Sequence, residues 1–306
     1  MGEGLTRREL LALAAQAAAA FALAGCGRGA LKADGGRPVR KPRPGKLAVA
    51  SKSDPASAAR AAVAAIGGMS AFVRKGDFVV IKPNAAWARP PEAAATTNPD
   101  VLAAVVAMCK EAGAGEVLVT DHAIDQPAEM VFTLTGIKAA AEKAGARVRA
   151  AQNESMFRRI EMPAGSVLAS DQVIKDVLRA DVFINVPIAK THGETTLTLG
   201  MKNLMGVIWN RQAWHSSDLH RCIAEFAGVV KPDLVVLDAT RLLLTNGPKG
   251  PGNTKHVGQV VAGTDQVAVD AYGASLFGIK ASEIEHIALA HQRGLGEIDY
   301  RKVKVG

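Results

Sequence analysis

Residues 185–206 read NVPIAKTHGETTLTLGMKNLMG, and this stretch combines features of a buried segment with features of a binding site. An apolar run ends at Pro187, and two lysines, a histidine, an asparagine and several hydroxyls then follow within about a loop's length. Leucines and methionines alternate with these polar residues, which is typical of a packed segment. A packed lysine needs an anionic partner. The stretch therefore indicates either an anion-binding site or a structural network of ion pairs, and by itself it favours neither.

Four more motifs flank this stretch in a fixed order: Lys82-Pro83-Asn84, Thr97-Asn98-Pro99, Asn246-Gly247-Pro248, and Gly263-Thr264-Asp265 continuing to Asp270. With the central stretch, they resemble the domain-of-unknown-function 362 family of bacteria and archaea over roughly residues 46–300. The resemblance implies an α/β domain and brings no settled activity.

Some members of that family carry a ferredoxin-like iron–sulfur module, and this chain differs from them. Its cysteines are Cys26, Cys109 and Cys222, so the Cys-x2-Cys spacing that holds such clusters is absent and no iron–sulfur cluster is expected. Cys109 and Cys222 lie in apolar helical stretches and are expected to be small buried hydrophobic residues.

The first 25 residues are predicted to be a signal peptide. Thr6-Arg7-Arg8-Glu9-Leu10-Leu11 resembles a twin-arginine motif that the twin-arginine translocase reads, and an Ala/Leu-rich segment follows it. Leu23-Ala24-Gly25-Cys26 is typical of a lipobox, in which Cys26 becomes the lipidated first residue. The apolar run is short for a span of about 20 residues. We therefore expect export to the cell envelope (periplasm), with membrane lipid attached through Cys26.

Residues 26–46 are predicted to be a disordered basic tether, because Gly, Pro and Arg dominate and almost nothing apolar is available to bury. Seven basic residues against Asp34 give this segment most of the chain's formal charge of +8. The rest of the protein is then close to neutral, which argues against a nucleic-acid partner.

Residues 47–306 are predicted to be an α/β body, as one large domain or two lobes. Short Val/Ile-rich runs with apolar residues on both faces predict buried parallel strands at 47–50, 78–82, 116–121, 147–150, 181–186, 234–238 and 257–262. Helical patterns separate most of them; Asn98 is expected to cap one helix and Thr135 the next. The alternation predicts a mostly parallel, doubly wound sheet with helices on both faces.

Polar residues follow several predicted strands at their carboxyl ends, which in a parallel sheet share one edge where ligands bind. The titratable candidates for acid/base catalysis are Asp121, His192 and Asp238. The candidates for binding a small anionic ligand are Lys82, Asn84, Lys190, Lys202, Asn203 and Asn246. The loop that begins at Asn246 could add backbone N–H groups and Lys249, although a simple surface turn is slightly preferred.

A divalent metal is a competing use of the same carboxylates and histidines. The sequence has no His-Glu-x-x-His or similarly compact ligand spacing, so any metal site would be assembled from distant segments.

These features predict an envelope-anchored enzyme that acts on a small anion by acid/base chemistry, with or without a metal. The first alternative is a non-catalytic lipoprotein that binds an anion or metal. The second is an accessory to an electron-transfer or cofactor-assembly system, by analogy with the ferredoxin-fused family members.

Overall fold

The computed structural model describes residues 44–305. The predicted signal peptide, Cys26 and nearly all of the basic tether lie outside the described residues. Between residues 44 and 305, none of the helices combines the length and apolar composition that crossing a bilayer requires.

The central sheet contains all seven predicted strands, in the order β1-β11-β10-β7-β2-β3-β4. Five neighbouring strands, β10, β7, β2, β3 and β4, run parallel, as expected. β11 runs antiparallel to both β10 and β1, because the short connection after β10 allows a hairpin but no crossover. The bounds are β1 Leu47–Ser51, β2 Phe78–Pro83, β3 Glu116–Val119, β4 Arg147–Val148, β7 Val182–Val186, β10 Leu234–Leu243 and β11 Thr254–Gly263.

Two strand pairs were not predicted from the sequence. After Pro187 the chain forms a hairpin of β8 (Ile188–His192) and β9 (Thr196–Thr198), and β8 pairs with the extended part of β10. The central stretch, expected to be a packed segment, is therefore built of two short strands and a short helix that were not predicted. A separate two-stranded sheet is made of β5 (Phe157–Glu161) and β6 (Ser170–Ile174).

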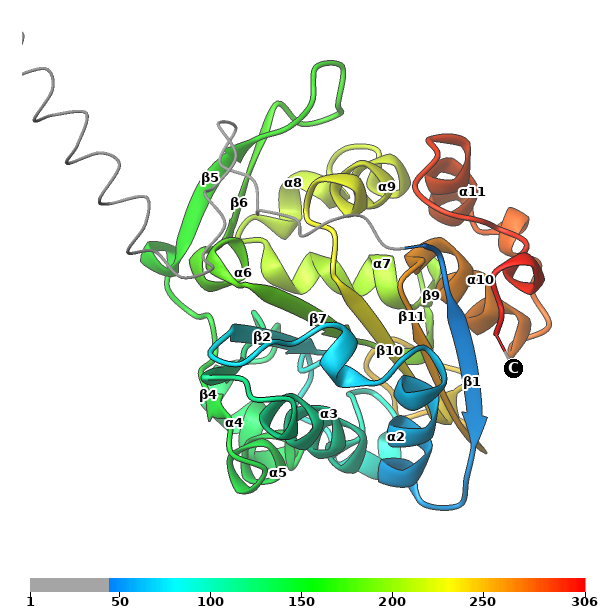
Figure 1. The fold of residues 1–306 in the computed structure, drawn as a ribbon. Helices are drawn as coiled ribbons and strands as arrows, with labels where there is room; N and C mark the ends of the chain where they lie inside the picture. Colours follow the sequence, from blue (N-terminus) through cyan, green and yellow to red (C-terminus); the bar gives the residue numbers. More distant parts are fainter. Residues whose placement is uncertain (1–43, 306) are drawn as a thin grey trace, which may run out of the picture. The chain divides into compact units, whose positions relative to one another are not determined.

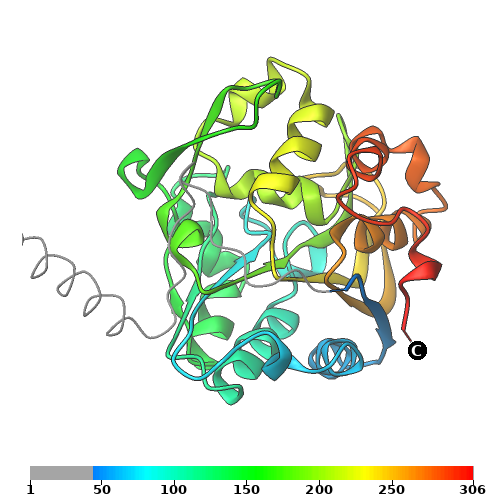
Figure 2. The ribbon, with the colours of Figure 1, turned by 45° about the horizontal axis from the view of Figure 1, so that its top comes forward.

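Helices cover both faces of the sheet, which confirms the predicted α/β class (Figure 1). One face carries α2 Pro55–Ala65, α3 Pro99–Glu111, α4 Ala128–Leu134 and α5 Ile137–Lys143. The other carries α6 Lys175–Arg179, α7 Gly200–Asn203, α8 Arg211–His215, α9 Leu219–Val229, α10 Gln266–Ser275 and α11 Glu285–Gln292. Figure 2 shows the same separation after a 45° turn, with the blue-to-cyan helices on one side of the strands and the yellow-to-red helices on the other.

Each face of the sheet has its own apolar core, because successive residues of a strand point to opposite faces. In β2, Val79 and Ile81 pack into the core under α2–α5, whereas Val80 packs into the core on the other side. Both faces are covered by buried apolar side chains, which explains why the parallel strands read as continuous apolar runs.

The predicted helix boundaries are correct at α3 and wrong at Thr135. Asn98 caps α3, since its side chain accepts a hydrogen bond of 2.8 Å from the N–H of Asp100, and Pro99 is the first helical residue. Thr135 is instead the C-cap of α4, and its buried hydroxyl donates to the carbonyl of Val131 at 2.7 Å; Gly136 is the N-cap of α5.

Candidate functional site

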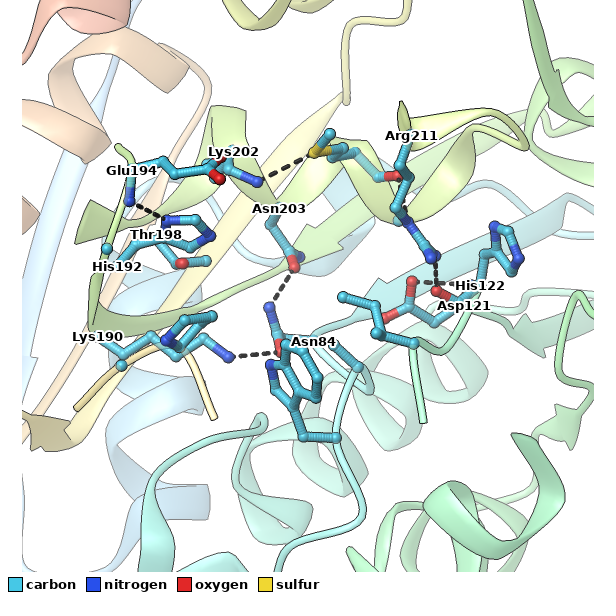
Figure 3. Close-up of a pocket in the computed structure, with 18 of the residues that line it drawn as sticks. Asn84, Asp121, His122, Lys190, His192, Glu194, Thr198, Lys202, Asn203 and Arg211 are labelled. Carbon is cyan, nitrogen blue, oxygen red and sulfur yellow. Dashed lines mark hydrogen bonds between the residues drawn. The ribbon is translucent and has the colours of Figure 1, made fainter. Parts of the chain in front are cut away.

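A cavity of about 340 Å³ lies beyond the carboxyl ends of β2 and β3 and against the β8–β9 hairpin. Segments far apart in the sequence supply its walls: the chain after β2, the chain after β3, the β8–β9 hairpin, and the segment from α7 to α8 (Figure 3). Seven of the nine predicted site residues line this cavity: Lys82, Asn84, Asp121, Lys190, His192, Lys202 and Asn203.

Lys82 is the lysine of this site that has a carboxylate partner. Its ammonium lies 3.0 Å from a carboxylate oxygen of Asp121, and both side chains are almost completely buried. It also donates to the side-chain oxygen of Asn203 at 3.0 Å and to the carbonyl of Pro83. Burial lowers the pKa of Lys82, and Asp121 opposes that shift. The ion pair supports the structural interpretation for Lys82.

Glycine at position 206 is what allows this ion pair to form. A Cβ at that position would lie 2.1 Å from a carboxylate oxygen of Asp121 and 2.6 Å from Cε of Lys82. The backbone N–H of His122 and that of Ala85 donate to the two oxygens of Asp121 at 2.9 and 2.7 Å. Both oxygens of Asp121 are therefore engaged within the protein, and the carboxylate is held in place as a structural partner.

Lys190 is buried and has no carboxylate partner among the residues that the structure describes. It donates to the side-chain oxygen of Asn84 at 3.1 Å and to the carbonyl of Ala95. Asn84 donates in turn to Asn203 at 2.9 Å, so the two predicted asparagines connect Lys190 to the Lys82 network. Burial, with repulsion from Lys82 and Lys202, holds the pKa of Lys190 well below its ordinary value.

The positive charge of Lys202 is balanced even less by its hydrogen-bond partners. The partner of its ammonium is the thioether sulfur of Met205 at 3.0 Å, although the residue is only 7% exposed. Burial lowers the pKa of Lys202 to about 8, against the attraction of Glu194. Arg211, which the sequence analysis did not single out, adds a further cation; it donates to the backbone carbonyl of His122.

The segment that carries Lys202 is held by residues whose role was not predicted. Asp270 is fully buried, and its carboxylate accepts from the backbone N–H of Gly200 at 2.6 Å and of Met201 at 2.9 Å, at the start of α7. Asn185 donates to the carbonyl of Gly200 at 2.8 Å and accepts from Asn203 at 2.8 Å. Burial raises the pKa of Asp270 to about 7. The one available signal was the position of Asp270 within a family motif.

His192 is held in a single tautomer. Its Nδ1 accepts from the backbone N–H of Glu194 at 3.1 Å and of Thr195 at 3.3 Å, so the ring proton must be on Nε2. Burial, with repulsion from Lys202 and Lys190, lowers its pKa to about 3. At neutral pH, His192 is therefore an uncharged hydrogen-bond donor toward its surroundings.

His122 is held in the opposite tautomer. Its Nδ1 lies 2.8 Å from the carbonyl of Ile208, which can only accept, so Nδ1 carries the proton and Nε2 carries the lone pair. Burial and the charge of Arg211 lower the pKa of His122. The ring also stacks on Trp209, with centroids 5.2 Å apart. The cavity wall thus contains one histidine that can donate a proton and one that can accept a proton.

Asp238 and Asn246 do not line the cavity, which corrects two predicted site residues. β10 continues to Leu243, so Asp238 lies within the strand, where its oxygens accept from the backbone N–H of Asn98 at 2.8 Å and of Thr240 at 2.9 Å. Burial raises the pKa of Asp238. Asn246 is exposed and donates to the carbonyl of Pro251 at 3.0 Å; the next two residues of its loop reach the cavity instead.

The structure also tests whether Lys249 is free to bind an anion and whether a metal site is present. Lys249, considered as an anion ligand, lies 3.0 Å from Asp125 and over the ring of Trp87. Within residues 44–305, no three histidine, cysteine or carboxylate side chains come close enough together to hold a metal ion. The metal interpretation therefore finds no ligand set in that part of the chain.

The model of the DUF362 family, a domain of unknown function, matches residues 79–275, and the chain belongs to this family. The thylakoid-associated protein sll1697 of Synechocystis sp. is 29% identical over 244 residues, covering 75% of this chain and 72% of that protein.

Two solved structures share part of the arrangement. The lactate racemase apoprotein of Thermoanaerobacterium thermosaccharolyticum is 13% identical, with a TM-score of 0.46 over 78% of this chain and 58% of that one. A protein of Thermotoga maritima is 11% identical, with a TM-score of 0.47 over 79% of this chain and 60% of that one. This chain therefore spans less than two thirds of the length of either.

Proposed function

We propose that this protein is an enzyme that binds a small anion in the cavity and transfers protons on it between His122 and His192. The observation that carries the proposal is the charge of the cavity wall. Lys190, Lys202 and Arg211 are largely buried there, and none forms an ion pair with a carboxylate in residues 44–305. Buried cations are unfavourable unless an anion compensates them, and a bound ligand would supply it.

The neutral groups of the wall also fit a polar ligand. The hydroxyl of Thr198 is buried in the cavity wall and has no hydrogen-bond partner among the described residues. Such a group is unfavourable unless something pairs with it. A carboxylate or phosphate oxygen would satisfy this hydroxyl and the neighbouring cations together.

The chemistry would use the fixed tautomers. With the anion held by the cations, Nε2 of His122 accepts a proton from the substrate and Nε2–H of His192 donates one to a substrate oxygen, or to the charge that develops there. Neither histidine needs to change tautomer before it reacts. Asp121, predicted as a catalytic group, serves this scheme by holding Lys82 and the backbone of His122.

Oxalate binding measured by titration calorimetry tests the anion site. We expect Lys190→Met and Lys202→Met each to weaken the affinity about tenfold or more, and to reduce the dependence of binding on salt, because each removes one charge-assisted contact. Lys138→Met removes an exposed lysine on α5 and should change neither. Equal affinity in all four proteins would contradict the anion site.

In the alternative function, the protein binds an anion in the same cavity but transfers no protons. This alternative is favoured by Asp121, because both of its carboxylate oxygens are already engaged by backbone N–H groups and Lys82. Exchange of the methyl protons of pyruvate with solvent deuterium, followed by NMR, separates the two. The enzyme proposal expects exchange that falls about 100-fold or more in His122→Gln and persists in His215→Gln, a histidine at the cavity rim paired with Glu194. Oxalate binding without exchange would favour a binding protein.

Export to the envelope and lipidation at Cys26 are part of the proposal. Replacing Arg7 and Arg8 by Lys should retain the protein in the cytoplasm, because the translocase reads the arginine pair. Cys26→Ala should leave export intact and release the protein from the membrane fraction. Fractionation followed by immunoblotting measures both, and normal export of the double lysine variant would remove the twin-arginine assignment.

A further inference from the structure

The three lysines of the cavity differ in what their nitrogen atoms contact. Lys82 donates to three oxygens, one of which belongs to Asp121, and Lys190 donates to two. Lys202 has no oxygen acceptor among the described residues, and its one hydrogen-bond partner is the sulfur of Met205. A thioether is a weak acceptor. The amine of Lys202 is therefore the least engaged of the three, although it lies in the same cavity wall.

The position of this amine is nevertheless well defined. Lys202 is the third residue of α7, whose first two N–H groups are held by the buried carboxylate of Asp270. The next residue, Asn203, is fixed by hydrogen bonds to Asn84 and Asn185. A side chain with an immobile backbone and an uncommitted terminal nitrogen, next to other cations, is arranged as a nucleophile.

We propose that the amine of Lys202 forms an imine with a small anionic carbonyl compound, such as an oxo acid, bound in the cavity. This rests on the proposed function, because the cavity must first hold the anion, and it narrows the substrate class to molecules with an aldehyde or ketone. The pKa of about 8 that burial gives Lys202 leaves part of the amine neutral near pH 7, as the attack requires.

The reaction balances with groups already in the cavity wall. The nitrogen lone pair attacks the carbonyl carbon, a C–N bond forms, and the π electrons move to the oxygen. The nitrogen passes one proton to Nε2 of His122, which returns it to the oxygen to give a carbinolamine, while Nε2–H of His192 donates a hydrogen bond to that oxygen. The hydroxyl then takes one proton from solvent, relayed by His122, and leaves as water while the nitrogen lone pair forms the C=N bond. No oxidant or reductant is needed, and the product is a protonated imine that can stabilise negative charge on the adjacent carbon.

Lys190 is a poorer candidate for the same reaction. Its N–H groups bond to the side chain of Asn84 and to the carbonyl of Ala95, and conversion to an imine would leave at least one of those buried acceptors without a donor. Within the described part of the chain, reaction at Lys202 disrupts one hydrogen bond, the contact with the Met205 sulfur. The structure thus predicts which lysine of the cavity reacts, and this can be read directly from peptide masses.

The test is reductive trapping of the full chain with glyoxylate and sodium cyanoborohydride near pH 7, followed by peptide mass mapping. We expect the reduced adduct on Lys202 to form at least about tenfold faster than on the exposed Lys138, because glyoxylate bound in the cavity lies beside the weakly engaged amine of Lys202, whereas Lys138 forms an exposed ion pair with Glu129. Lys82 and Lys190 should stay unmodified. Oxalate, an anion without an aldehyde or ketone carbonyl, should slow the labelling of Lys202 and leave that of Lys138 unchanged.

Lys202→Arg separates this inference from the anion site. A guanidinium stays protonated and cannot attack a carbonyl, but it keeps the charge. The variant should lose the cavity adduct and retain oxalate binding. Oxalate binding to the wild type without excess labelling of Lys202 over Lys138 would overturn the imine and leave the anion site standing. Absence of oxalate binding would overturn both. The wild-type measurements decide the matter even if the variant fails to fold.

Discussion

Replacing Lys82 by methionine should destabilise the protein by roughly 3–5 kcal/mol, which is the usual effect of removing one partner from a buried ion pair. The carboxylate of Asp121 would remain 2% exposed with no cation at 3.0 Å to balance it. Urea unfolding followed by circular dichroism measures the effect as a fall in the midpoint with an unchanged slope.

Lys190→Met is the matched control, because Lys190 is as deeply buried as Lys82 but has no carboxylate partner within residues 44–305. Its stability should stay within about 1 kcal/mol of the wild type, since the lost hydrogen bonds are offset by removal of an uncompensated cation. Asp121→Asn combined with Lys82→Met should cost less than the sum of the two single changes. Equal destabilisation by Lys82→Met and Lys190→Met would contradict the distinction between a paired lysine and a ligand-binding lysine.

The convergence of the site was predictable because it follows from topology. Lys82 is the last residue but one of β2 and lies opposite Asn185 of β7 in the sheet, and Asp121 follows β3, so parallel pairing brings their side chains to one edge. The polar groups of the central stretch follow β7 in the same way. This inference needed only the direction of the strands and the approximate position of their ends.

Asp238 shows where that argument fails. The predicted strand ended at this residue, but β10 continues for five more residues, since it pairs with β8 on one side and with β11 on the other. β8 is distant from β10 in the sequence, and although β11 is the next strand, no local pattern marks the extension. The carboxylate consequently serves the backbone around Asn98 instead of the cavity.

The sequence also could not predict which side chains contact one another. No sequence feature near Gly206 indicates that this position must lack a side chain to leave room for the ion pair of Lys82 and Asp121. The tautomers of His122 and His192 depend on whether a carbonyl or an N–H lies beside Nδ1, which only the folded backbone decides. The sequence could therefore identify chemical groups, but not whether a lysine was paired or free, or a histidine acidic or basic.

The stability of the free protein should rise with pH between about 8 and 10.5 because of Lys202. Its pKa falls from an ordinary 10.5 to about 8 on folding, so in this range the unfolded chain binds a proton that the folded chain does not. Stability increases with pH wherever the unfolded state binds more protons, and this difference amounts to about 3 kcal/mol across the window.

Lys202→Met isolates that contribution. The variant should be more stable than the wild type at pH 7, and the advantage should shrink through the window and vanish above about pH 11, where this amine is neutral in both the folded and the unfolded wild type. Lys202 also lowers the pKa of Lys190, so its removal eases the burial of a second cation.

Oxalate should act in the opposite direction: it favours the protonated amine, so its affinity for the wild type should weaken as pH rises above about 8. Unfolding free energies and oxalate titrations at several pH values measure both trends. A constant difference in stability between the two proteins from pH 7 to 10.5 would mean that Lys202 keeps an ordinary pKa in the fold, and that an anion or a carboxylate already compensates its charge.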